Sequence, residues 1–306
     1  MTIAMKSPDS NPLSGRQRIL LTGATGFVGR HLVQQLVAGH EVLALSRREV
    51  PELTRLGVRC VLADLGANAD LAAVLPASGV DRIIHLAQSD GYRDFPGSAM
   101  DMFQVNVAST AALVDHAAKP AVKGFVLPLT GSVYEPYAKP MDEASAQAPE
   151  SHYARTKLAA ELLAQSYSKL FNVCALRLFF PYGPQQTGRL VPNLFQRVQA
   201  GEKVSLDGDE GGMVFTPTHI DDVTAVLRTA AVSGWQGAIN VATSEALSIK
   251  DVAQAIGRII GREPTFERTG KAGQLTIVPP TAVLAGLMPD FRFRSFEDGA
   301  RFFGQA

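Results

Sequence analysis

The sequence has few cysteines, no excess of charge of either sign and no long apolar run. Its 306 residues include two cysteines, Cys60 and Cys174, too few for a disulfide scaffold or a four-cysteine zinc site. Lys+Arg and Asp+Glu both number 29, so the basic excess usual in nucleic-acid-binding proteins is missing. No stretch approaches the roughly 18 apolar residues of a membrane-spanning helix. The apolar share of 46% and charged share of 19% predict an ordinary globular protein.

Two further absences concern targeting and metals. Residues 1–17 are polar and rich in turn formers, and they lack the apolar core of a signal peptide. We therefore expect a flexible N-terminal tail over residues 1–17 and a cytoplasmic protein. The six histidines show no HxxxH or HExxH spacing, so we expect no metal site.

Short apolar runs alternate with helical patterns through the first part of the chain. Strands are predicted at residues 18–21, 41–46, 59–63, 82–86, 124–127 and 173–179, and the longest helices at 98–118 and 151–170. The runs are almost continuously apolar, which is typical of parallel strands covered on both faces. The pattern predicts an α/β fold with a Rossmann-like doubly wound parallel sheet.

The pattern becomes less regular after residue 180. Turn formers gather at 181–188 and 208–212, and helices are predicted at 220–231 and 248–260, the second capped by Ser248. We expect residues 18–180 to form the NAD(P)-binding Rossmann domain, with segments around 215–245 returning to it. Residues 181–306 are expected to form mainly a smaller, irregular α/β lobe that binds the substrate.

A glycine-rich turn, TGATGFVG at residues 22–29, follows the first predicted strand and opens a helix. Gly23, Gly26 and Gly29 permit a tight turn, a close approach of the backbone to a pyrophosphate, and close packing of helix on strand. The turn therefore predicts dinucleotide binding.

The residues after the second predicted strand bear on the choice of dinucleotide. An acidic residue there would bind the ribose of NAD, but this chain has Ser46-Arg47-Arg48. An arginine can pair with a 2′-phosphate in a forked geometry. We favour NADP(H), while NAD(H) remains possible if these arginines are a solvated surface run.

Tyr153 and Lys157 are four residues apart on a predicted helix and share one face. A neighbouring ammonium and an oxidised nicotinamide would both favour the phenolate and lower the tyrosine pKa. The pair can therefore act as general acid or base near neutral pH.

Several motifs stand in the order found in one enzyme family. TGATGFVG is similar to TGxxGFxG, residues 85–88 (HLAQ) to HxAA, 106–110 (NVAST) to NVxGT, 130–134 (TGSVY) to SSxxVYG, 176–184 (LRLFFPYGP) to LRxFNVYGP and 219–223 (HIDDV) to HVDDV. Asp64-Leu65 matches the pair that contacts the adenine. From about residue 18 to 231 the chain thus resembles the extended short-chain dehydrogenase/reductases, the NAD(P)-dependent epimerase/dehydratase group.

The resemblance implies a role for each matching residue. Tyr153 would move a proton to or from a substrate hydroxyl or ketone, Lys157 would lower its pKa and hold the nicotinamide ribose, and Thr130 would hydrogen-bond the substrate oxygen. Substrate contacts are expected from Ser132, Val133 and Phe180. Cofactor contacts are expected from Gly23, Thr25, Gly26, Phe27, Val28, Gly29, Ser46, Arg47, Arg48, Asp64, Leu65, Leu86, Ala87, Gln88, Asn106, Leu129, Tyr153, Lys157, Phe179 and Phe180.

The chain departs from the family pattern around the substrate. Dehydratases carry an Asp-Glu pair after the catalytic Thr, where this chain has Gly131-Ser132, so 4,6-dehydration is not expected. The Asn that commonly meets a substrate diphosphate is Phe180, and the Arg expected near residues 213–216 is absent. Glu135 replaces a glycine, and Pro128-Leu129 precede Thr130, so we expect an unusually shaped active-site loop.

These features together predict an NAD(P)-dependent oxidoreductase that transfers hydride on a sugar or nucleotide-sugar derivative as a ketoreductase. The NADP preference supports this, because a reductase releases its cofactor at each turnover. The alternatives are a nucleotide-sugar C4 epimerase with retained NAD, a reductase of a non-sugar ketone, and a non-catalytic dinucleotide sensor. The resemblance also implies a homodimer formed through the helices at 98–118 and 151–170. No nucleic-acid or membrane partner is expected.

Overall fold

The computed structural model describes residues 15–67, 70–75, 80–119, 122–137, 140–208, 211–270, 273 and 275–305. Most of the tail expected at residues 1–17 lies outside them. The chain forms two compact units: Met1–Pro136 with Ala146–Arg177 and Thr224–Ile239, and Tyr137–Ser145 with Leu178–Val223 and Asn240–Ala306. Of the segment around 215–245 that was expected to return to the Rossmann domain, residues 224–239 group with the first unit.

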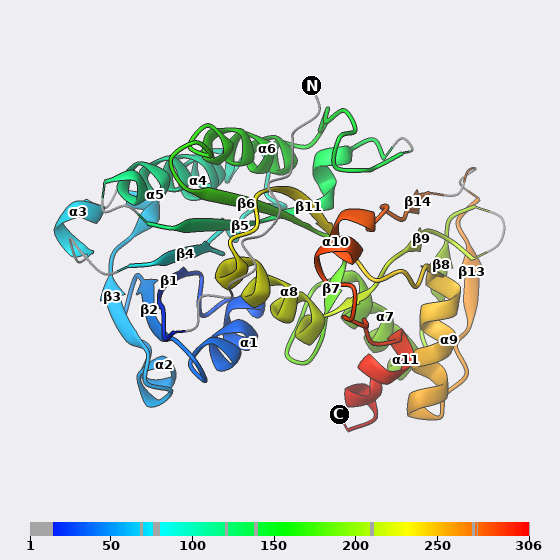
Figure 1. Cartoon of the computed structure of the whole chain (residues 1–306). Coiled ribbons are helices and arrows are strands. Elements are labelled where there is room, and N and C mark those ends of the chain that lie inside the picture. The colour runs from blue at the N-terminus through cyan, green and yellow to red at the C-terminus, as the bar shows by residue number, and fades with distance from the viewer. Residues whose placement is uncertain are drawn as a thin grey trace. The chain divides into compact units, whose positions relative to one another are not determined.

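A seven-stranded sheet forms the centre of the first unit, in the order β11-β6-β5-β4-β1-β2-β3 (Figure 1). Its strands are β1 (Arg18–Thr22), β2 (Glu41–Ser46), β3 (Arg59–Leu62), β4 (Arg82–His85), β5 (Gly124–Thr130), β6 (Asn172–Leu178) and β11 (Gly237–Val241). β1 lies between β2 and β4 and pairs with both in parallel. The strand order reverses there, which is where open α/β sheets bind ligands, at the carboxyl ends of the strands.

Helices cover both faces of this sheet, which confirms the Rossmann-like α/β fold. Figure 1 shows α1 (Phe27–Leu36) and α2 (Pro51–Arg55) on the face opposite α4 (Ala99–Met102), α5 (Ser109–Ala118) and α6 (His152–Gln165). Two shorter elements of this unit are α3 (Leu71–Val74) and the 3-10 turn η1 (Leu65–Ala67), and a second 3-10 turn, η3 (Gly131–Tyr134), follows β5. α8 (Ile220–Ser233) is tied to α1 by a 2.6 Å hydrogen bond from Gln35 Nε2 to Thr224 Oγ1.

The helix expected at 98–118 contains a wide turn that sequence periodicity does not reveal. Between α4 and α5 the chain is π-helical over Phe103–Ala108, labelled η2. Two hydroxyls bond carbonyls in this stretch: Ser109 Oγ donates to Val105 at 2.5 Å and Thr110 Oγ1 to Asn106 at 2.7 Å.

Two other predicted boundaries differ from the observed ones by three residues or more. The helix expected to reach residue 170 ends at Gln165, and the strand expected to end at residue 127 continues through Pro128 to Thr130. Proline cannot donate to a neighbouring strand. β4 pairs with β5 only as far as Val126, so that neighbour needs no N–H from Pro128.

Short strands and helical segments make up the second unit. Its strands are β7 (Pro181–Tyr182), β8 (Val204–Leu206), β9 (Val214–Phe215), β10 (Thr218–His219), β12 (Leu247–Ser248), β13 (Phe266–Arg268) and β14 (Thr276–Ile277), and its helices are α7 (Leu190–Ala200), α9 (Ile249–Ile260), α10 (Ala282–Leu287), α11 (Phe296–Gly299) and η4 (Arg301–Gln305). Ser248 caps α9 as predicted, in a capping box with Asp251. α7 and α9 share a core with Phe215 and Phe296.

In the described part of the chain, every helix is too short or too polar to span a lipid bilayer. The same residues contain no group of three or more His, Cys, Asp or Glu side chains placed to hold a metal ion.

Candidate active site

The glycine turn between β1 and α1 is formed by very close backbone contacts. Gly23 has a φ of +68°, and a Cβ on it would lie 2.7 Å from the backbone nitrogen of Ala87, just after β4. A Cβ on Gly29 would lie 2.1 Å from the Gly23 carbonyl oxygen. Only glycine fits these two positions, because any side chain would overlap backbone atoms.

Gly26 differs from its two neighbours in this turn. A Cβ there would meet only the Gly23 carbonyl, at 3.3 Å, and the residue is the N-cap of α1 with no side-chain cap. Thr25 beside it is exposed, and Phe27 and Val28 are half-buried in the first turn of the helix. An uncapped helix N-terminus with an open glycine suits a phosphate group, so the turn fits a dinucleotide pyrophosphate.

The residues expected near the adenosine end follow β2 and β3. Ser46 Oγ donates to the Arg48 carbonyl at 2.5 Å, while Arg47 and Arg48 are both exposed. Asp64 Oδ1 accepts from the Gly66 N–H at 2.9 Å, and Leu65 packs in the core. The two guanidinium groups are therefore accessible to an anionic ligand.

A chain of hydrogen bonds joins the carboxyl ends of β1 and β4 to the start of α5. The Ala87 N–H donates to Thr22 Oγ1 at 3.0 Å, Thr22 lies 2.7 Å from His85 Nδ1, and His85 Nε2 lies 3.1 Å from Ser109 Oγ. Ser109 gives its proton to the Val105 carbonyl, so His85 Nε2 donates to Ser109 and Nδ1 accepts from Thr22. Burial lowers the pKa of His85 to about 3, in agreement with this neutral imidazole. His85 therefore has a structural role, joining β1 and β4 to α5.

Asn106 lies behind the segment that follows β4. Its Oδ1 accepts from the Ser89 N–H at 3.1 Å, and its Nδ2 donates to Thr156 Oγ1 at 3.0 Å. The side chain is buried, and both ends of its amide are bonded to protein groups. Asn106 therefore joins this segment to α6. Leu86 and Ala87, just before Ser89, are half-buried.

Tyr153 and Lys157 lie on α6, which begins with Ser151 as its N-cap, accepting from the Ala154 N–H at 3.3 Å. Tyr153 is half-buried, whereas Lys157 is 4% exposed. Lys157 Nζ donates to the Pro128 carbonyl at 3.3 Å, and burial lowers its pKa to about 8. The ammonium thus lies beside β5, two residues before Thr130.

Thr130 ends β5, and its Oγ1 accepts from the Ser132 N–H at 3.2 Å. The loop after it is tied to α6 by Glu135, the residue that replaces the family's glycine. Glu135 Oε2 accepts from the N–H groups of Glu150 and Ser151 at 3.1 and 2.9 Å, and Oε1 from Ser151 Oγ at 3.2 Å. The expected unusual loop is therefore fastened to the start of the helix that carries Tyr153.

Two contacts of Tyr153 bear directly on its chemistry. Its hydroxyl donates to Gln88 Oε1 at 3.3 Å, and its ring lies 5.4 Å from that of Tyr92. Gln88 was expected only as a cofactor contact, and Tyr92 was not expected at the site. No local sequence signal connects either residue with position 153, because the contacts span about 60 residues of chain.

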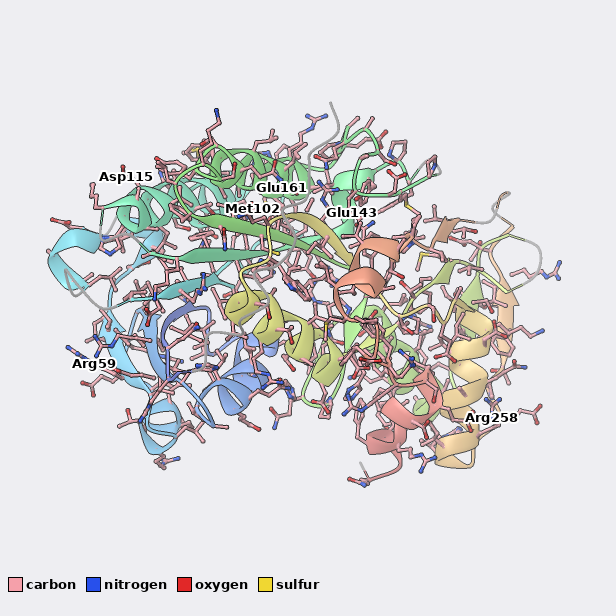
Figure 2. The ribbon with its side chains drawn as sticks, in the orientation of Figure 1. Arg59, Met102, Asp115, Glu143, Glu161 and Arg258 are labelled. Atoms are coloured by element: carbon pink, nitrogen blue, oxygen red, sulfur yellow. The ribbon has the colours of Figure 1, made fainter. Side chains whose placement is uncertain are left out.

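A buried ion pair beneath this region was also missed by sequence reasoning. Figure 2 labels Glu161 on α6. Arg177 on β6 bonds this glutamate through two nitrogens, at 3.2 and 2.5 Å, and both side chains are 2% exposed. Arg177 Nη1 also donates to the Tyr134 hydroxyl at 2.5 Å. A charge at the buried position 161, one helical turn after Lys157, is the only signal the sequence offers.

The expected substrate residues fall in different environments. Ser132 is half-buried and Val133 is fully buried in η3, as is Leu129 in β5. Phe179 and Phe180 belong to the second unit, where the Phe180 ring lies 4.8 Å from that of Phe215 and its φ is +42°. An apolar ring thus stands where the family pattern has an amide.

Comparison with known proteins agrees with this arrangement. Residues 19–242 match the model of the NAD dependent epimerase/dehydratase family. The chain belongs to that family. It is similar to a dTDP-4-dehydro-6-deoxy-D-allose reductase of Streptomyces bikiniensis, at 29% identity over 266 residues that cover 80% of this chain and 81% of the relative.

Two further proteins are similar to this chain, and their names point to different substrates or ligands. A 2-alkyl-3-oxoalkanoate reductase of Stenotrophomonas maltophilia is 36% identical over 218 residues, 67% of this chain and 62% of that protein. MoeE5, solved with UDP-glucose and NAD, superposes with a TM-score of 0.78 at 28% identity, covering 94% of this chain and 97% of its own. The chain is thus an extended short-chain dehydrogenase/reductase, an NAD(P)-dependent oxidoreductase.

The glycine contacts predict different outcomes at neighbouring positions. Gly29→Ala places a methyl against the Gly23 carbonyl, so we expect a loss of about 3 kcal/mol in unfolding free energy. Gly26→Ala should cost less than about 1 kcal/mol but weaken binding of the nicotinamide dinucleotide about tenfold or more, because its methyl blocks the approach of a pyrophosphate. Thermal unfolding and calorimetric titration with NADPH and with NADH measure the two effects. A fully stable Gly29→Ala, or a Gly26→Ala variant that binds the preferred dinucleotide as tightly as the unaltered protein, would contradict this account.

Proposed function

We propose that this chain is an NADP(H)-dependent ketoreductase acting on a sugar or nucleotide-sugar derivative. The observation that carries the proposal is Tyr153 on α6 with Lys157 one turn later, its buried ammonium donating to the Pro128 carbonyl next to Thr130. A protein that only sensed a dinucleotide would need no proton donor such as Tyr153, nor a lysine placed to stabilise its phenolate. The 29% identity to a deoxysugar reductase supports the substrate class.

In this mechanism each residue has a limited task. A bound nicotinamide supplies the hydride. Tyr153 gives its phenolic proton to the oxygen of the ketone, and Thr130 holds that oxygen through its hydroxyl. Lys157 stabilises the phenolate that results, because a nearby positive charge favours the ionised form. The low pKa of Lys157 in the protein alone reflects burial, and a phenolate or bound anion nearby would favour its charged form.

Residues 131–132 distinguish this activity from others of the family. Gly131 and Ser132 follow Thr130 where a dehydratase would carry two acids, so no carboxylate stands there to remove a substrate proton. An epimerase that retains NAD is the closest alternative, since MoeE5 was solved with NAD and UDP-glucose. The exposed Arg47 and Arg48 favour an exchangeable NADP(H) instead.

A non-sugar ketone is the second candidate substrate, and one observation favours it. Phe180 and Phe215 form an aromatic pair in the second unit, which we propose selects the substrate. Phe215 is buried, so only the half-buried Phe180 ring could meet a substrate, and it offers no hydrogen bond to a diphosphate but suits an alkyl chain. The 36% identity to an oxoalkanoate reductase supports this alternative.

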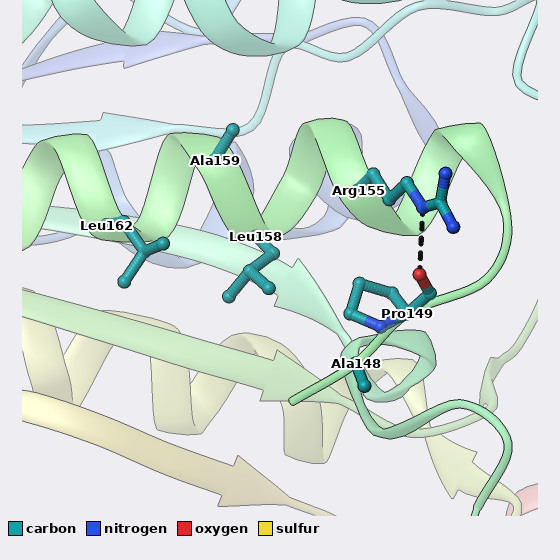
Figure 3. A pocket seen from close by; sticks show the side chains of 6 residues that line it. All are labelled: Ala148, Pro149, Arg155, Leu158, Ala159 and Leu162. Carbon is teal, nitrogen blue, oxygen red and sulfur yellow. Dashed lines mark hydrogen bonds between the residues drawn. The ribbon is translucent and has the colours of Figure 1, made fainter. Parts of the chain in front are cut away.

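We also propose that the protein is a homodimer through the α4–α6 layer. Large apolar side chains are exposed there: Met100 (67%), Phe103 (45%), Leu162 (58%) and Leu163 (39%). Leu162 also lines a hollow of about 430 Å³, shown in Figure 3, together with Ala148, Pro149, Arg155, Leu158 and Ala159. Exposed apolar side chains of this kind can be buried by a second copy of the chain. The cytoplasmic location stays a prediction of the sequence.

Activity with a defined ketone tests the central proposal. We expect NADPH oxidation with a dTDP-4-keto-6-deoxysugar, and a loss of at least 100-fold (order of magnitude) in kcat for Tyr153→Phe, with NADPH affinity unchanged. Turnover of an alkyl 3-oxoacid instead would select the second candidate. Interconversion of UDP-sugars without net NADPH oxidation, together with tightly held NAD⁺ released on heating, would replace the reductase by an epimerase.

Binding by an arginine variant tests the NADP(H) preference. Arg47→Ala should weaken NADPH binding about tenfold or more, because a charge-assisted bond to the 2′-phosphate is lost, and should leave NADH binding unchanged. Arg59→Ala is the matched control, because Arg59 is exposed but pairs with Leu43, toward the opposite end of β2 from Arg47. Equal effects on NADPH and NADH would show that Arg47 does not recognise the phosphate.

Sedimentation velocity tests the dimer. Leu162→Glu should shift the protein from dimer to monomer, because it places a charge within the exposed apolar layer. Leu56→Glu, at another exposed leucine (43%) after α2 on the opposite face of the sheet, should leave the dimer intact. A wild-type protein that sediments as a monomer at micromolar concentration would refute the proposal.

A further inference from the structure

The partner of the Tyr153 hydroxyl is a residue that the family pattern does not provide. In the HxAA pattern the residue aligned with Gln88 is alanine, which has no polar side-chain atom. Here the Tyr153 hydroxyl donates to Gln88 Oε1 at 3.3 Å. This distance is long for an O–H···O bond, so the phenol can exchange the amide for a substrate oxygen at small cost.

The backbone that carries Gln88 is firmly anchored. The next residue, Ser89, donates its N–H to Asn106 at 3.1 Å, its hydroxyl donates to the Asp101 carboxylate, and it accepts from the Gly91 N–H at 3.1 Å. Ser89 is 1% exposed. The half-buried Gln88 side chain therefore projects from a fixed point toward Tyr153.

A carboxamide beside a phenol can do what an alanine cannot. While the phenol is protonated, the amide oxygen accepts its hydrogen and holds the hydroxyl in one direction. The protein gains a neutral acceptor for the phenol proton without adding a charge.

We propose that Gln88 is a positioning residue for proton transfer, which keeps the Tyr153 hydroxyl protonated and oriented until a ketone oxygen replaces the amide. The proposal rests on the role given to Tyr153 in the proposed function. It suits a reductase, in which the tyrosine must start each turnover as an acid.

Other ionisable groups face α6 from the elements packed against it, and they are common to every variant at position 88. They are Lys157, Glu161, His152 and Arg155 on α6 itself, Tyr134 on η3, Glu135 just after η3, Asp101 on α4, Asp115 and His116 on α5, Arg177 on β6, and Tyr92 and Arg93 on the segment after β4. β5 and η2 carry none. A change in Tyr153 titration on replacing Gln88 therefore reports the amide itself.

Ultraviolet difference titration tests this without any substrate. The tyrosinate signal of Tyr153 is the difference between each protein and its Tyr153→Phe counterpart, recorded with NADP⁺ bound. In Gln88→Ala the ionisation midpoint should fall by about one pH unit, because the acceptor of the phenol proton is gone. In Gln88→Glu it should rise by about one unit or more, because the carboxylate accepts the same proton and disfavours a second negative charge.

Gln88→Met controls for shape, since it has nearly the volume of glutamine and no amide, and it should behave as Gln88→Ala does. A distortion of the site would not move the midpoint in opposite directions for Ala and Glu. An unchanged midpoint in Ala and Met, or a rise in both, would overturn the proposal. If no ketone is ever turned over, the proposed function fails. The titration needs no substrate, so it still tests whether Gln88 keeps the Tyr153 hydroxyl protonated.

Discussion

The buried pair between Arg177 and Glu161 is the interaction on which the catalytic region depends. It joins β6 to α6, and the bond from Arg177 to Tyr134 adds η3, the turn that follows Thr130. Removing two charges from water is costly, and a buried pair often contributes little net stability compared with apolar residues. Losing one partner is different, because the other charge would then lie buried and uncompensated at a cost of about 3–5 kcal/mol. The pair therefore serves to fix one arrangement of the three elements, and the tyrosine and lysine occupy the turns of α6 that precede Glu161.

Burial also explains the low pKa of Lys157. Its ammonium is as buried as the ion pair but has a carbonyl in place of a carboxylate, so its pKa falls to about 8. A carboxylate at that point would have kept the lysine fully charged and neutralised its field. A carbonyl satisfies one N–H and leaves the positive charge free to act on a phenolate. Pro128 supplies that carbonyl while having no N–H of its own to satisfy, and β4 pairing has already ended at Val126.

Local signals made much of this structure predictable. The glycine turn, six of the seven strands of the main sheet and the Ser248 cap each depend on residues a few positions apart, and each lies at or close to its expected place, whereas β11 was not predicted. The helix face that carries Tyr153 and Lys157 is of the same kind. Contacts between distant segments were not predictable: Gln88 meets Tyr153 across 65 residues, and Glu135 reaches Ser151 across 16. Their residue types gave no warning, because glutamine and glutamate are common on surfaces. Pro128 was expected only to shape the active-site loop, and it lies within β5, which continues beyond the predicted end at residue 127 to Thr130.

The departures from the family pattern have a common physical theme. Tyr153, Lys157 and Thr130 are kept, and the altered positions lie around them. Glu135 in place of glycine adds three hydrogen bonds to the N-terminus of α6, which makes the start of that helix more rigid. Gln88 in place of alanine adds a neutral partner for the phenol. Phe180 in place of asparagine removes a polar group from the second unit. In the proposed function, the first two changes add fixed polar contacts around Tyr153, the proton donor. The third removes a polar group from the unit that we propose selects the substrate. The proposed chemistry is thus kept, while substrate recognition can differ from that of relatives.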